Sequence, residues 1–173
     1  MTGLMTMTVN GFVALPDPNR ARWYGGGLLV FLTTGAETKG QFALFEALVP
    51  GGEEVPFHTH AREDESFYIL DGEITCRIGE ATLRAKAGQF LFLPRTVRHS
   101  WRAESATLRF LVLITPAGFE QSFLEFSEPA PTLTLPPVSG EGPPREWLDR
   151  LIKRENDLGV VYDFQREDGA AAL

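Results

Sequence analysis

The 173-residue chain is poor in cysteine, in long apolar runs and in positive charge, and each shortage excludes a class of protein. Cys76 is the only cysteine, so an internal disulfide and a thiolate metal cluster are excluded, and a reduced, cytoplasmic setting is expected. The longest apolar stretches, 28–32 and 110–114, are far shorter than the ~20 residues of a membrane span. Residues 1–16 lack the basic and apolar regions of a secretory signal, so the sequence predicts a soluble protein.

Positive charge is scarce as well: 16 lysines and arginines face 23 acidic residues, giving a formal net charge of -7. An acidic surface repels phosphate groups, so neither a nucleic acid nor a membrane is expected as a partner. This balance favours a neutral or apolar small molecule.

The length and local composition of the chain predict a single domain that can be divided into four segments. They are an N-terminal segment (1–22), a barrel (23–128), a Pro-rich crossing segment with a cover helix (129–165), and a disordered tail (166–173). The last four residues, Ala170–Leu173, could be a remnant of an expression vector.

The central region reads as an all-β domain, because short runs rich in Phe, Leu, Val and Ile are each closed by Gly, Pro or Asp-Gly. Closely spaced strands of this kind indicate a barrel or sandwich. The predicted strands are 27–33, 41–49, 57–60, 65–70, 74–78, 81–85, 89–93, 99–103 and 107–114.

Turn residues predict how some of these strands connect. Asp71-Gly72 and Gly79-Glu80 have the composition of tight hairpins, since Gly and Asp tolerate positive φ. Beyond Thr115, residues 119–126 are predicted to form a short helix. A second helix is expected to begin at Pro144 and to end at Gly159, packed on the barrel as a cover.

All three histidines of the chain fall where one metal site needs them. His58 and His60 are two residues apart, so in a strand they point to the same face, and Glu65 and His99 follow on later strands. Imidazole and carboxylate groups are common ligands of divalent transition metals. The alternative, three unrelated histidines, is the default for any single histidine but explains this grouping less well.

The spacing around these ligands resembles the two sequence motifs of the cupin superfamily. The first motif is present in full, as Gly52, His58, His60, Glu65 and Gly72 with five, one, four and six residues between them. In the second motif, Gly88, Pro94 and His99 keep the spacing, whereas Thr96 and Ala103 stand where the family usually has Gly and often has Asn.

This resemblance implies a double-stranded β-helix, the jelly-roll barrel of the cupins, with a metal held by three histidines and a glutamate. Residues 42–115 carry it, and further features such as Trp23-Tyr24-Gly25-Gly26 look like bacterial single-cupin proteins similar to quercetin dioxygenase. The expected cofactor is one divalent transition metal ion per chain, with Fe, Mn, Ni, Co, Cu and Zn all open.

Among the three adjacent acids, Glu65 is the preferred ligand because it matches the family spacing. Asp64 is a minor competitor, and Glu63 and Asp64 are otherwise expected to be solvated charges. Because a β-branched residue resists positive φ, Thr96 predicts that the turn after Pro94 departs from the family geometry.

The resemblance implies a metal-dependent dioxygenase that takes a flavonol-like or other enolisable aromatic and O2 at the metal, with Glu65 as ligand and general base. Phe67 and Ile69 lie on the same strand face as Glu65, and Trp101 lies on the same face as His99, so these three residues are expected to line the substrate pocket. Phe92 is a further candidate for substrate binding.

Two other functions stay open at this point. The same site could catalyse a non-oxidative cyclisation or isomerisation as a Lewis acid, or the protein could bind a small aromatic molecule without turnover. A homodimer is also expected, because an unpaired edge strand within 23–33 would invite a second copy.

Overall fold

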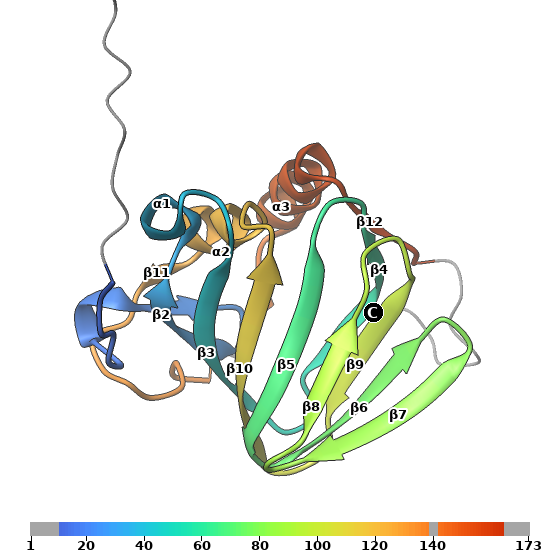
Figure 1. Ribbon diagram of the computed structural model, residues 1–173, viewed down its shortest axis with the longest axis horizontal. Helices are drawn as coiled ribbons and strands as arrows, with labels where there is room; N and C mark the ends of the chain where they lie inside the picture. The colour runs from blue at the N-terminus through green and yellow to red at the C-terminus, as the bar shows by residue number, and fades with distance from the viewer. Residues whose placement is uncertain (1–10, 139–141, 165–173) are drawn as a thin grey trace, which may run out of the picture.

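The structure is a computed structural model that describes residues 11–138 and 142–164. Two antiparallel sheets face each other, converge at one end and open at the other, where helices α1, α2 and α3 gather (Figure 1). The all-β prediction is confirmed, and the arrangement is a jelly-roll with a short helical C-terminal part. The predicted tail, 166–173, and residues 1–10 lie outside the described part of the chain.

The larger sheet has seven strands in the order β11-β1-β2-β3-β10-β5-β8. These are β11 (Glu128–Pro129), β1 (Ala21–Tyr24), β2 (Gly27–Thr33), β3 (Ala43–Pro50), β10 (Thr107–Thr115), β5 (Asp64–Asp71) and β8 (Phe90–Leu93). The smaller sheet has the order β12-β4-β9-β6-β7. Its strands are β12 (Val160–Tyr162), β4 (Glu54–His60), β9 (His99–Ala103), β6 (Glu73–Ile78) and β7 (Ala81–Lys86).

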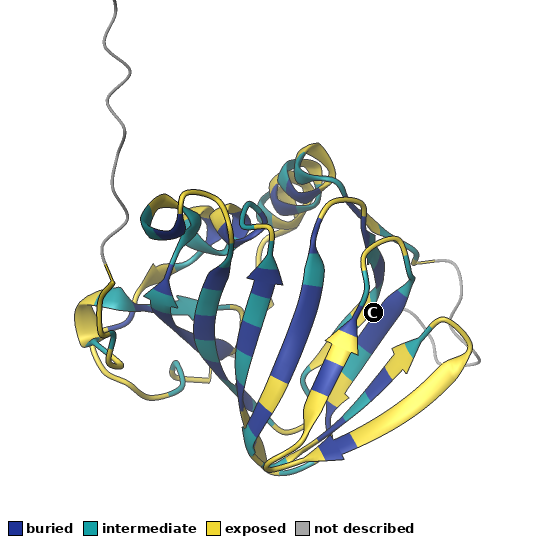
Figure 2. Ribbon diagram, in the orientation of Figure 1, coloured by how far each residue is buried: buried dark blue, intermediate teal, exposed yellow. Residues whose placement is uncertain are grey.

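Alternating apolar residues place the core between the two sheets, as the alternating colours along β3 and β10 show (Figure 2). Phe45, Phe67 and Phe110 are among the largest fully or almost fully buried side chains. Removing one such side chain from water stabilises the fold by about 2 kcal/mol. All nine predicted strands are present with ends shifted by at most three residues, whereas β1, β11 and β12 were not predicted.

One of the two predicted hairpins is wrong. Gly79-Glu80 does join β6 to its antiparallel partner β7, but Asp71-Gly72 leads from β5 in one sheet to β6 in the other. Gly72 has φ +86, and a Cβ there would lie 2.5 Å from the carbonyl oxygen of Thr107. Glycine is therefore required for a crossing between sheets rather than for a hairpin.

The helices close the open end and the sides of the barrel. They are a 3-10 turn η1 (Pro18–Arg20), α1 (Gly35–Thr38), α2 (Glu120–Phe126) and α3 (Arg145–Leu158). Gly159 ends α3 with φ +95, as the sequence predicted, and the chain continues at once into β12 beside β4. No helix in the described part of the chain has the length and apolar composition needed to span a bilayer.

The prediction of an unpaired edge strand within 23–33 is wrong. Within 23–33, β2 lies between β1 and β3, and β1 pairs in turn with β11 at Arg22 and Trp23. No long unpaired edge is left there for a second copy. The homodimer itself stays a prediction.

Candidate metal centre

Strand geometry brings the three histidines together at one end of the smaller sheet. His58 and His60 lie on the same face of β4, and His99 at the start of β9 pairs directly with His58. The centroid of the His58 ring lies 4.4 Å from that of His99 and 5.1 Å from that of His60. The spacing of two along β4 is what turns both imidazoles inward.

Glu65 completes the group from the opposite sheet. Its Oε2 lies 3.6 Å from Nε2 of His99 and 4.0 Å from Nε2 of His60. One ligand atom from each of His58, His60, Glu65 and His99 lies within 4.8 Å of all the others, and the four side chains are at most 8% exposed. The structure thus brings together all four predicted ligands.

Backbone carbonyls fix the tautomers of two of the imidazoles. Nδ1 of His58 lies 2.8 Å from the carbonyl oxygen of Pro56, and Nδ1 of His99 lies 3.0 Å from that of Val97. A carbonyl oxygen can only accept, so the proton sits on Nδ1 and the lone pair of Nε2 faces the centre. Nε2 of His60 and of His99 are buried without a hydrogen-bond partner in the described structure, as metal-binding atoms would be.

The electrostatics also suit a cation. Burial, followed by the neighbouring His99 and His60, lowers the pKa of His58 to about 3, so this imidazole is neutral and able to coordinate. Burial raises the pKa of Glu65, but the nearby imidazoles of His99, His60 and His58 outweigh burial and leave the pKa below its ordinary value. Three imidazole nitrogens and one carboxylate oxygen form a donor set that fits a divalent transition ion.

Glu63 is not the solvated charge that the sequence suggested. Its side chain is 4% exposed, and Oε2 lies 3.9 Å from Nδ1 of His60. Both atoms lack another hydrogen-bond partner among the described residues. Glu63 therefore occupies for His60 the position that backbone carbonyls occupy for the other two histidines.

Asp64 is excluded as a ligand by its own partner. Arg95 binds its carboxylate through the guanidinium at 2.6 Å and through the backbone N–H at 2.8 Å. These hydrogen bonds lower the pKa of Asp64 and hold its side chain on the outer side of β5. Strand alternation explains why its neighbour Glu65 points inward.

Thr96 adopts the conformation that its branched side chain was expected to resist. Its φ is +63, and its N–H donates to the carbonyl oxygen of His60 at 2.7 Å. The turn after Pro94 therefore keeps the left-handed geometry of a glycine and is hydrogen-bonded to the strand that carries two of the candidate ligands, His58 and His60.

An apolar cavity of about 110 Å³ adjoins the ligands. His58 and Glu65 form part of its wall, and the predicted residues Phe67 and Trp101 line it as well. The sequence did not point to Tyr24, Phe119, Phe123, Tyr162 and Glu53, which also line it. Tyr24 and Tyr162 belong to strands that were not predicted, so no local pattern marked them.

Two predicted wall residues lie elsewhere. Ile69 is fully buried in the core and does not line the cavity. Phe92 is 51% exposed on the outer face, because it pairs with Ser66 while Leu93 pairs with Glu65 and takes the inward position. The prediction that Phe92 binds the substrate is therefore wrong, because alternation along β8 turns Leu93 inward and Phe92 outward.

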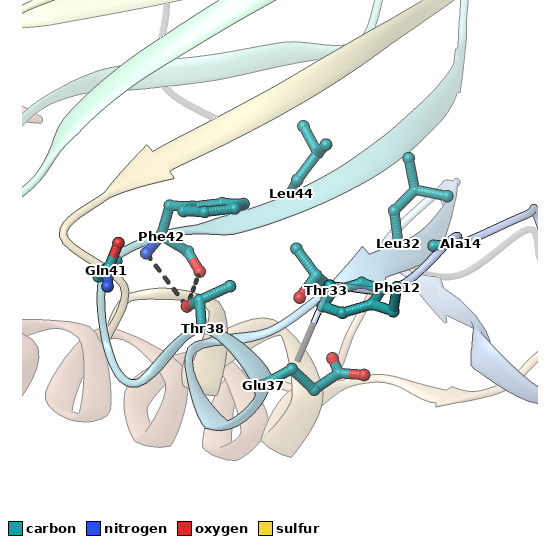
Figure 3. A pocket seen from close by; sticks show the side chains of 10 residues that line it. Phe12, Ala14, Leu32, Thr33, Glu37, Thr38, Gln41, Phe42 and Leu44 are labelled. Atoms are coloured by element: carbon teal, nitrogen blue, oxygen red, sulfur yellow. Dashed lines mark hydrogen bonds between the residues drawn. The ribbon is translucent and has the colours of Figure 1, made fainter. Parts of the chain in front are cut away.

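A second, larger hollow of about 460 Å³ lies apart from the histidines, between the N-terminal segment, β2, β3 and α1 (Figure 3). Phe12, Phe42 and Leu44 supply apolar wall, and Thr38 bonds the backbone of Phe42. Among the described lining residues only Glu37 is ionisable, and it is already paired with Arg20. The described lining of this hollow therefore offers no ligand set for a metal.

Comparison with known proteins agrees with this geometry. The family model described as "Cupin domain" matches residues 44–114. Protein SchB of Streptomyces halstedii is 32% identical over 102 residues, which make up 57% of this chain and 71% of that protein. The chain belongs to the cupin superfamily.

One further relative and one solved structure show how much of this cupin is similar to known proteins. Quercetin 2,3-dioxygenase of Bacillus subtilis is 29% identical over 92 residues, which are 53% of this chain but only 27% of that enzyme. The solved structure of KdgF from a Halomonas species superposes with a TM-score of 0.58 at 14% identity, covering 65% of this chain and 99% of KdgF. The second match shows the fold alone.

Cys76 plays no part in this centre. It is fully buried mid-strand in β6, and burial, followed by the charge of Glu65, raises the pKa of its thiol to about 12. A thiol with so high a pKa is a poor nucleophile. Cys76 is therefore a small buried residue of the core.

Proposed function

We propose that this cupin is a metal-dependent dioxygenase that acts on a small aromatic or otherwise enolisable molecule. The observation that carries the proposal is the position of Glu65, which belongs to the ligand group and also lines the apolar cavity. One carboxylate is thereby within reach of both a metal and a substrate. The matched quercetin 2,3-dioxygenase supports the same reaction type.

A divalent transition metal would be held by His58, His60, Glu65 and His99, and it would supply Lewis acidity and a place for dioxygen to react. The protein contributes the remaining steps. Phe67 and Trp101 hold an aromatic ring by apolar contact and exclude water. Glu65 accepts the proton of a substrate hydroxyl, which makes the substrate electron-rich.

Both atoms of O2 enter the product in this reaction, so the substrate itself supplies the electrons and no external reductant is needed. The substrate proton passes to the carboxylate of Glu65 and returns when product forms. Such chemistry needs no second cofactor.

The experiment is metal analysis of protein purified without added metal, combined with oxygen uptake on a panel of flavonols and one-ring enolisable phenols. We expect about one transition metal ion per chain and oxygen uptake that the His99→Ala variant loses. Product formation that proceeds equally well without oxygen would instead indicate a non-oxidative cyclase or isomerase. Tight binding of a panel member without any product would indicate a binding protein.

A further inference from the structure

The cavity beside the metal ligands offers no positive charge to a ligand. Its lining includes two carboxylates, Glu53 and Glu65, and one imidazole, His58, whereas no lysine or arginine belongs to the described lining. An anionic ligand entering this space would lose its hydration without gaining an ion pair from the wall. Only a metal ion held by the four ligands could offset the hydration that such an anion loses.

Two tyrosines from distant parts of the chain line the same cavity, and their hydroxyl groups meet at one buried carboxylate. Tyr24 lies on β1 and Tyr162 on β12, and both hydroxyls meet the carboxylate of Glu155 in α3. The hydroxyl of Tyr162 donates to Oε2 at 2.6 Å, and that of Tyr24 donates to Oε1 at the longer distance of 3.5 Å. Ser122 in α2 donates to Oε1 at 2.8 Å.

Glu155 is fully buried and is surrounded by these hydroxyl donors. A phenol has one proton, and when that proton is given to a carboxylate its oxygen can only accept further hydrogen bonds. Each tyrosine oxygen has therefore given its proton to Glu155 and offers only lone pairs to a ligand group that reaches it from the cavity. A ligand group that donates a hydrogen bond can pair with these tyrosine oxygens, whereas a group that only accepts hydrogen bonds cannot.

The size of the cavity sets a further limit. An apolar cavity of 150 Å³ accommodates benzene. At about 110 Å³ the cavity beside the metal ligands is smaller than that, so it takes at most one small ring and is too small for a flavonol with three rings.

We propose that the ligand of this cavity is a neutral molecule of single-ring size with a hydroxyl or N–H donor that binds the oxygens of Tyr24 and Tyr162. Carboxylic acids of the same size are disfavoured. The inference rests on the proposed function only in placing the substrate in this cavity, and it narrows the substrate class of that function.

The test uses three one-ring probes: phenol, which donates, toluene, which has a methyl group in place of the hydroxyl, and benzoate, which is an anion. Their dissociation constants are measured on the full chain by NMR titration of the Trp101 indole N–H, both with the metal acquired during expression and after its removal. The variants are Tyr24→Phe combined with Tyr162→Phe, and Glu155→Gln. Ser122→Ala is the matched control, because Ser122 bonds Glu155 without lining the cavity.

We expect phenol to bind metal-free protein at least fivefold more tightly than benzoate. The ratio of toluene to phenol dissociation constants should fall about fivefold or more in the double tyrosine variant, the loss expected for one or two neutral hydrogen bonds. Glu155→Gln should lower this ratio in the same direction, since the amide can no longer accept from both hydroxyls. The Glu155→Gln variant also tests the inference if the double tyrosine variant fails to fold. Ser122→Ala should leave the ratio within twofold of the wild-type value.

Three results would overturn the inference: an unchanged ratio in both the double tyrosine and the Glu155→Gln variants, benzoate binding as tight as that of phenol without metal, or no saturable binding of phenol. None of them depends on turnover. Binding as expected without oxygen uptake would refute the dioxygenase and leave the ligand class standing. Oxygen uptake driven by a carboxylate of this size would refute the ligand class and leave the dioxygenase.

Discussion

Oε2 of Glu63 lies 3.9 Å from Nδ1 of His60, and both atoms are buried without another hydrogen-bond partner among the described residues. A small rotation of either side chain would make this contact a hydrogen bond. A carboxylate in this position orients the imidazole and increases its basicity as a metal ligand. The pair therefore links an acid outside the ligand set to the metal site.

Replacing Glu63 with Leu should weaken metal binding by about 10- to 100-fold, the usual cost of losing such a partner. Glu63→Gln keeps one accepting oxygen and should lose less. Competition with a chromophoric chelator measures the affinity. Asp64→Asn is the matched control, because Asp64 pairs with Arg95 outside the site and should leave affinity within about twofold. Equal affinities of Glu63→Leu and wild type would show that Glu63 does not orient His60.

Glu65→Gln should separate the two roles of this residue. If its carboxylate is both ligand and base, turnover at saturating metal should fall by about 100-fold or more, whereas metal affinity should fall by a smaller factor. Steady-state oxygen uptake and metal titration of the same preparation give the two numbers. Parallel losses in both would remove the general-base role and leave only ligation.

Removing the metal should destabilise the protein, because an ion that binds only the folded state stabilises it by mass action. With free metal at 100 times its Kd the gain is about 2.7 kcal/mol, or roughly 5 to 10 °C in Tm for a chain of this length. Calorimetry before and after chelation measures the shift. The His99→Ala variant, which lacks one ligand, should show little dependence on metal, and an equal shift in that variant would place the ion elsewhere.

Thr96→Gly should stabilise the fold by about 0.5 to 1 kcal/mol, because a branched residue at φ +63 is more strained than glycine is entropically costly. Urea unfolding should show a higher midpoint with an unchanged slope. Thr82→Gly on the exposed face of β7 is the control and should be destabilising, since that threonine is in ordinary strand conformation. A destabilised Thr96→Gly protein would mean that the threonine side chain itself holds the turn.

Glu37 should contribute stability that disappears in acid. Its hydrogen bonds from Arg20 outweigh burial and lower the pKa of the carboxyl from 4.5 to about 2. The folded protein thus binds the proton less readily than the unfolded chain, so the contribution is complete above pH 4.5 and is lost as the pH falls toward 2. Because the pair is partly exposed, we expect only about 0.5 to 1 kcal/mol.

The matched comparison is wild type against Glu37→Gln in urea unfolding at pH 7 and near pH 3. The difference in unfolding free energy between the two proteins should shrink at the lower pH. A constant difference would mean that Glu37 stabilises the fold through capping of α1 by a neutral side chain, not through its charge.

The sequence alone determined the local features. Alternation placed His58 and His60 on one face of a strand, the motif spacing selected Glu65 over Asp64, and Gly159 marked the end of the last helix. Each of these depends on a period or a cap that reaches only a few residues along the chain.

Only the tertiary structure decided which face of each strand is the inside and which distant residues meet. It turned Phe92 outward, buried Glu63 beside His60, and made Asp71-Gly72 a crossing between sheets. It also joined Tyr24 to Glu155 across 131 positions of sequence. Local periodicity fixes the parity of a strand but not its partner, and contacts of such separation depend on how the sheets and helices pack.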